Sequence, residues 1–183
     1  MKTHFDIEQF IIAGTIRSEL DYERAMAADR KLRLLAKDSA HFKKLRSKLR
    51  DLIEAYEAHH WSDHKAVTRK QIQQSESAEQ AAEAERKFME KRKATIRKKL
   101  KSLDLTQEDL TQILGHKSKT HMSELMNGIR PFTLSDLIVI SILLKIDLHE
   151  LVPIFLNLEK RQHVRSALRR LNKPKLNRIA LAF

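Results

Sequence analysis

Hydrophobic residues recur at helical spacing in three stretches of the first sixty residues, 5–17, 19–36 and 41–60. Apolar positions three and four apart lie on one face of a helix, and such a face is usually buried. We therefore expect three amphipathic helices, which form a helical region over residues 1–65. Their expected inner faces are Phe5, Gln9, Ile12 and Ile16; Tyr22, Ala25, Met26, Leu32 and Leu35; and Leu45, Leu49, Leu52, Ile53 and Tyr56.

The pattern changes after this region. Residues 71–85 are rich in Gln, Ala and Glu and have almost no large apolar side chains. This composition indicates either an exposed helical connector or a disordered segment, and we expect a polar linker helix over 66–91. A stripe then resumes at Phe88, Arg92, Ile96, Leu100 and Leu103, with Lys and Arg on the other faces. This stripe predicts a helix that begins a second domain, and we expect that domain to span residues 92–153.

Capping residues divide the rest of that domain into short helices. Thr106, Ser118 and Thr133 are of the type that caps helix N-termini, and Gly115 and Gly128 suit the left-handed residue at a C-terminus. Asp147 and Glu150 resemble a capping box before a last turn that ends at Pro153. The expected buried faces are Leu110, Ile113 and Leu114; Met122 and Leu125; and Leu134, Leu137, Ile138 and Leu144.

Two short helices joined at Gly115 match a helix-turn-helix, whose second helix enters the major groove of DNA. Hydrogen-bonding side chains remain on the outer face of that second helix. They are Lys119, Thr120, His121 and Ser123, after the capping Ser118.

The charge distribution points to a polyanionic partner. The chain has 183 residues and a net charge of +12, of which residues 66–103 carry +6 and residues 154–183 carry +7. The segment 104–153 between them carries −3. Nucleic acid and an acidic membrane surface both fit such basic blocks. We expect residues 154–183, with a stripe at Val164, Leu168 and Leu171, to form a basic helical extension that docks and contacts phosphate.

Other classes of function lack a signature. The chain has no cysteine and no apolar stretch of signal-peptide or membrane-span length, so a cytoplasmic protein without membrane association is expected. No nucleophile elbow or Gly-rich phosphate loop occurs, which predicts neither catalysis nor a cofactor. His59, His60, Asp63 and His64 cluster, and His60 and His64, four positions apart, could share a metal ion. No third ligand with supporting spacing is evident, so a solvated helix end and no metal are expected.

The motifs LTQEDL, MSELMNG and LHELV resemble the Cro/CI-like (XRE) helix-turn-helix family over residues 92–153. The resemblance implies an all-α protein whose C-terminal five-helix domain binds an operator in double-stranded DNA as a homodimer. The resemblance also implies that Gln107 contacts phosphate at the start of the first motif helix. It further implies that Lys119, Thr120 and Ser123 face bases and that Arg130 contacts the DNA backbone. The turn is one residue longer than is usual for the family, and a shifted register would make His116 and Lys117 the reading residues instead.

The N-terminal region is similar to that of HigA-type antitoxins. The matching residues are Asp21, Tyr22, Ala25, Leu32, Leu35, Leu52, Ile53, Tyr56, Glu57 and His60. This resemblance implies that residues 1–65 serve dimerisation or bind a HigB-like toxin, an mRNA endonuclease that the antitoxin neutralises while repressing its own operon. A stand-alone repressor, phage-like or metabolic, is the alternative.

Overall fold

The computed structural model describes residues 5–60, 68–153, 156, 158–171, 173 and 175–176. These residues contain helices and no strand, which confirms the all-α class. The helices are α1 (Ile7–Ala13), α2 (Glu19–Leu35), α3 (Ala40–His60), α4 (Arg69–Ser102), α5 (Gln107–Ile113), α6 (Lys119–Asn127), α7 (Leu134–Leu144), α8 (Leu148–Leu151) and α9 (Leu158–Arg170). The chain divides into two units, Met1–Pro153 and Ile154–Phe183.

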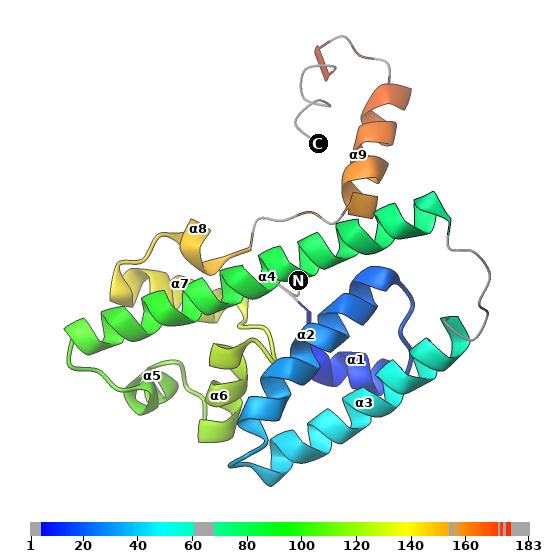
Figure 1. Cartoon of the computed structure of the whole chain (residues 1–183). Coiled ribbons are helices and arrows are strands. Elements are labelled where there is room, and N and C mark those ends of the chain that lie inside the picture. Colours follow the sequence, from blue (N-terminus) through cyan, green and yellow to red (C-terminus); the bar gives the residue numbers. More distant parts are fainter. Residues whose placement is uncertain are drawn as a thin grey trace. The chain divides into compact units, whose positions relative to one another are not determined.

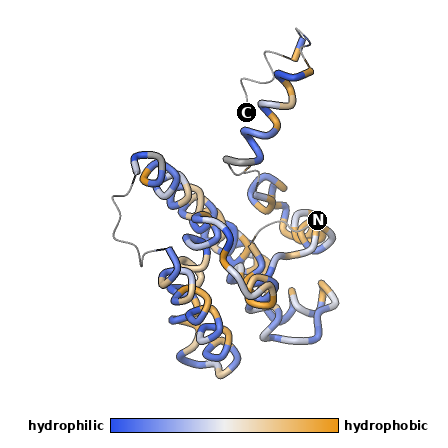
Figure 2. Tube along the Cα trace, turned by 90° about the vertical axis from the view of Figure 1, so that its right-hand side faces the viewer, coloured by the Kyte–Doolittle hydropathy of each residue, from blue (hydrophilic) through white to orange (hydrophobic). Residues whose placement is uncertain are grey.

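In the first unit, α4 is the common support for two groups of helices (Figure 1). Helix α2 packs on both α3 and α4, while α6, α7 and α8 contact α4 further along the chain. Hydrophobic and hydrophilic positions alternate along the helices, as amphipathic packing requires (Figure 2).

The N-terminal helices share a core that the sequence pattern largely predicted. Ala25, Leu32, Leu49 and Ile53 are all buried there. The expected face of the first helix was only partly right. Phe5 and Ile16 pack against this core, but Ile12 is 73% exposed and Ile7 is buried instead. The helix is only seven residues long and ends at Gly14, which has a φ of 72°, so the spacing expected over 5–17 does not extend through it.

The polar segment 71–85 lies within α4, a single helix of 34 residues. Its small side chains let it pack closely against α2, and Ala78 and Ala82 are both 6% exposed. Across this contact, the guanidinium of Arg24 donates two hydrogen bonds to the Glu85 carboxylate, of 2.9 and 2.5 Å. The expected linker and the first helix of the expected second domain are therefore parts of one continuous helix.

A second core joins the C-terminal part of α4 to the four helices that follow. It consists of Ile96, Leu100, Leu110, Met122, Leu125, Met126, Phe132, Leu137, Ile140, Leu144, Ile146 and Leu151. Three expected core residues are wrong: Ile113 is 46% exposed, Leu134 57% and Ile138 42%. Helix α7 is apolar on nearly every side, so the pattern alone did not identify which face would be buried.

The residues just after α6 connect the two cores. Ile129 is fully buried among the N-terminal helices, and its carbonyl oxygen accepts a 3.0 Å hydrogen bond from the Ile7 N–H. At the C-terminal end of α6, Lys31 donates to the carbonyl oxygen of Asn127 at 2.9 Å, and Lys93 donates to its side-chain oxygen at 2.5 Å. Burial lowers the pKa of both lysines. Helices α2 and α4 thus both hold the end of α6.

The second unit contains α9, a helix of 13 residues. Val164 and Leu168 are partly buried, whereas Leu171 is 57% exposed. Arg161, Arg165, Arg169 and Arg170 are exposed. The expected stripe is therefore present in part, beside an exposed row of arginines.

Candidate nucleic-acid interface

Local capping explains why α5 and α6 begin and end where they do. Thr106 caps α5 in a complete capping box, in which its hydroxyl accepts from the Asp109 N–H and the Asp109 carboxylate accepts from the Thr106 N–H. The Thr106 hydroxyl and then the Thr106 N–H, which both donate to the Asp109 carboxylate at 2.7 Å, lower the pKa of Asp109. The hydroxyl of Ser118 caps α6 by accepting from the His121 N–H at 3.2 Å. Gly115 and Gly128 have φ angles of 73° and 67°. The N-caps Thr106 and Ser118 and the left-handed glycines Gly115 and Gly128 all agree with the sequence prediction.

The first turn of α6 presents polar side chains to solvent. Ser118 and Thr120 are exposed, and the Lys119 side chain is 78% exposed. The Lys119 ammonium lies 2.9 Å from the Glu108 carboxylate of α5, an exposed pair that contributes little stability. Met122 and Leu125 are buried on the opposite side, as expected. The exposed side chains of this turn can therefore hydrogen-bond to a partner, while the opposite side of the helix is fixed in the core by Met122 and Leu125.

Two other expected site residues are less accessible. His121 is partly buried, and its Nδ1 lies 3.5 Å from Oε2 of the buried Glu124. Ser123 is also partly buried, and its hydroxyl and carbonyl oxygens accept hydrogen bonds from the side-chain amide of Asn127. Of the alternative reading residues, Lys117 is exposed and His116 lies 3.4 Å from Asp136.

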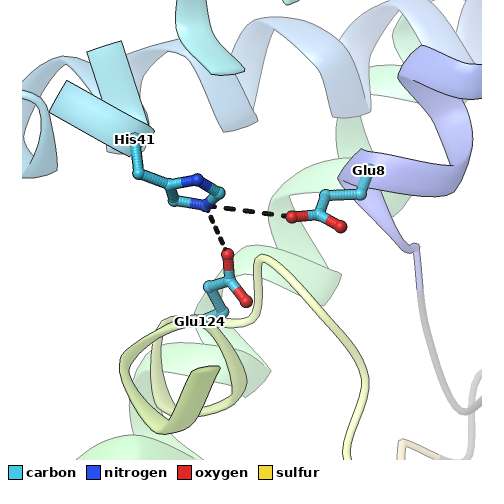
Figure 3. Close-up of side chains that lie close together, drawn as sticks. All are labelled: Glu8, His41 and Glu124. Atoms are coloured by element: carbon cyan, nitrogen blue, oxygen red, sulfur yellow. Dashed lines mark hydrogen bonds and ion pairs between the residues drawn. The ribbon is translucent and has the colours of Figure 1, made fainter. Parts of the chain in front are cut away.

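Arg130 belongs to a cluster of charged residues from three helices. Its guanidinium pairs with Glu8 of α1, and its Nε lies 3.1 Å from Oε2 of Glu124 in α6. The other oxygens of these two carboxylates face Nε2 of His41 in α3, at 3.8 Å for Glu8 and 2.6 Å for Glu124 (Figure 3). A phosphate contact by Arg130 stays a prediction, and it would compete with these intramolecular ion pairs.

Gln107 lies beside two basic residues that the sequence reasoning did not assign to the site. Arg97 and Lys101 of α4, one turn apart, line a hollow together with Gln107 and the acidic Asp104. The side chains of Arg97, Lys101 and Gln107 can donate hydrogen bonds to an anion. The sequence signal of Arg97 and Lys101 was present in the basic block of residues 66–103, but the net charge of the block did not distinguish exposed from internally paired cations.

Other cations of that block are occupied within the protein. Arg86 is paired with Glu83 and Glu90. Arg92 is 2% exposed, donates to the Leu151 carbonyl oxygen at 3.2 Å and lies over the ring of Phe132. Burial lowers the pKa of Arg92 to about 10. These two arginines are thus not available to a partner in this arrangement.

The residues behind the antitoxin resemblance meet between α2 and α3. The Tyr22 hydroxyl donates to Glu57 at 2.7 Å, and the Tyr56 hydroxyl donates to Glu19 at 3.1 Å. The Tyr56 ring stacks on both Tyr22 and His60. Burial, followed by the neighbouring carboxylates, raises the pKa of Tyr22, and the same causes raise that of Tyr56 to about 12. These contacts give the matching residues a structural role.

No protein-family model, curated protein or solved structure matches this chain. Within the described ranges, none of the helices combines the length and apolar character that crossing a membrane demands.

Proposed function

We propose that this protein is a sequence-specific DNA-binding repressor that reads the major groove with the first turns of α6. The observation that carries the proposal is the division of α6 into two faces. Met122 and Leu125 are buried, while Lys119 and Thr120 are exposed at the start of the helix. A short helix with this polarity, preceded by another short helix and a tight turn, has the form of a recognition helix.

Phosphate contacts are proposed for the hollow beside α5. Arg97, Lys101 and Gln107 line it together with Asp104, so two positive charges and one negative charge surround it. Contacts of this kind position a protein on the duplex, and base contacts from α6 would supply specificity. The net charge of +12 supports association with DNA in general.

The protein is further proposed to act as a homodimer through an apolar face of α7. Leu134, Ile138, Val139 and Ile142 are exposed on neighbouring positions of this helix, Ile142 at 75%. The only charged residue of α7, Asp136, is buried. Two copies that each carry +12 repel one another, so an uncharged face is where they can approach closely. Two reading heads on one duplex would also double the few base contacts of a single α6.

Sedimentation velocity tests this interface. The wild type is expected to be a dimer and Ile142→Lys a monomer, because the lysine places a charge in the apolar contact. Ile12→Lys is the matched control, since Ile12 is 73% exposed on α1, and it should remain dimeric. A wild type that is monomeric both free and on DNA contradicts the proposal.

An antitoxin role is proposed for the N-terminal helices. The contacts of Ile7 with Ile129 and of Lys31 with Asn127 attach these helices to the end of α6. A toxin bound to residues 1–65 could therefore change DNA affinity through α6. The test is co-expression with the product of the neighbouring reading frame, which should form a complex with this chain and alter its operator affinity. Absence of such a complex favours the stand-alone repressor.

DNA binding itself is tested by fluorescence anisotropy. The probe is a duplex from the region upstream of the protein's own gene, and the control is a shuffled duplex of equal length and composition. Specific binding predicts at least a roughly thousandfold preference at a fixed salt concentration. Equal affinity for the two duplexes contradicts sequence-specific recognition.

A further inference from the structure

The charged cluster around Arg130 contains three side chains of types that bind metal ions. Glu8, His41 and Glu124 each offer one ligand atom, and these atoms all lie within 4.8 Å of one another. The three residues come from α1, α3 and α6, and their side chains converge from separate elements (Figure 3). We propose that these residues form a binding site for a divalent first-row transition-metal ion, with Zn²⁺ as the test ion. This inference does not depend on DNA binding.

The ligand types suit such an ion. An imidazole nitrogen with two carboxylate oxygens is a mixed set typical of zinc and its neighbours, whereas calcium and magnesium prefer oxygen alone. Metal–ligand distances of about 2.0–2.2 Å in tetrahedral geometry place neighbouring ligand atoms roughly 3.3–3.6 Å apart. The distances from His41 Nε2 are 2.6 Å to Glu124 and 3.8 Å to Glu8. Movements of less than about 1 Å in each pair would bring these atoms to the spacing for a cation.

The charges of the cluster also favour a cation. Glu8 and Glu124 bring two negative charges, and Arg130 compensates one of them. One guanidinium therefore serves two carboxylates, and the Glu124 side chain is only 4% exposed. A buried charge that lacks a counter-charge is costly, so a bound cation would stabilise the cluster.

Arg130 would orient the ligands. It contacts Oε2 of Glu8 and Oε2 of Glu124, whereas Oε1 of each carboxylate faces His41. The oxygens directed at the proposed site are therefore the ones that Arg130 leaves free. Outer contacts of this kind commonly fix the direction of metal-binding side chains. The His41 side chain is 44% exposed, which gives an ion access from solvent.

Isothermal titration of the tag-free, chelator-treated full chain with Zn²⁺ tests the site. We expect one ion per chain, with at least tenfold weaker binding by His41→Ala and by Glu8→Gln. His149→Ala is the matched control, because His149 is an exposed histidine that also contacts a carboxylate, Asp147, at 2.7 Å. It should bind Zn²⁺ as the wild type does.

Visible absorption with Co²⁺ separates ligation from a loss of structure. A Co²⁺ ion bound by nitrogen and oxygen ligands should give a d–d band in the wild type and in His149→Ala. The band should be lost in His41→Ala and Glu8→Gln while the far-ultraviolet circular dichroism stays unchanged. The proposal is overturned if the wild type binds no ion, or if the His41 and Glu8 variants bind it with unchanged affinity and spectrum.

Discussion

Replacement of Ile129 by Ala tests the connection between α6 and the N-terminal helices. Ile129 is 0% exposed and packs in the N-terminal core, although it follows α6 in the chain. The change removes three methyl or methylene groups, which corresponds to about 2.4 kcal/mol at ~0.8 kcal/mol each. A cavity of roughly 80 Å³ that does not relax adds up to about 2 kcal/mol. We expect the free energy of unfolding to fall by about 2.5–4 kcal/mol.

Urea unfolding followed by circular dichroism measures this difference. Ile12→Ala is the matched control, because the same groups are removed from a side chain that is 73% exposed on α1. It should change the free energy of unfolding by less than about 0.5 kcal/mol. A loss below about 0.5 kcal/mol for Ile129→Ala as well would mean that the N-terminal helices do not enclose Ile129. Residues 1–65 would then fold apart from α6.

Three further predictions concern charge and protonation. Lys101→Ala should lower the slope of log K against log[salt] for DNA binding by about one without changing the preferred sequence, and an unchanged slope would place Lys101 off the phosphates. Arg130→Ala should weaken binding to all duplexes about equally if Arg130 leaves its carboxylate partners for phosphate, and unchanged affinity would keep it in the cluster. The raised pKa of Tyr56 contributes stability that is complete below pH 10 and is lost as the pH rises towards about 12. The free energy of unfolding should therefore fall less between pH 10 and 12 in Tyr56→Phe than in the wild type, and parallel curves would exclude this cause.

Local rules explain how much of the candidate site the sequence predicted. The helix caps Thr106 and Ser118 depend on neighbours within four positions, and the burial of Met122 and Leu125 was predicted from their i, i+3 spacing on one helix. Such short-range signals can be recognised in a single sequence. The helical spacing of the apolar residues likewise predicted most of the helices.

Long-range packing explains what was missed. The placement of Ile129 among the N-terminal helices and the burial of Glu124 beside His41 depend on residues far apart in the chain. Ile142 illustrates a second difficulty, since α7 is apolar nearly all round and its periodicity does not mark an outer face. Arg92 illustrates a third difficulty. A cation in a basic block is expected to be exposed, but Arg92 is buried and donates to the carbonyl oxygen of Leu151 on α8.

Selection from a duplex library with a randomised site tests the central claim most directly. The wild type should enrich one sequence, and Lys119→Ala should relax the preference at one position of it. The expected loss of specific affinity is about 1–3 kcal/mol, the range for one good base contact. Leu125→Ala, which removes a buried side chain, should instead destabilise the fold. Enrichment of no sequence by the wild type would contradict sequence-specific recognition, and an unchanged profile for Lys119→Ala would exclude Lys119 as a reading residue.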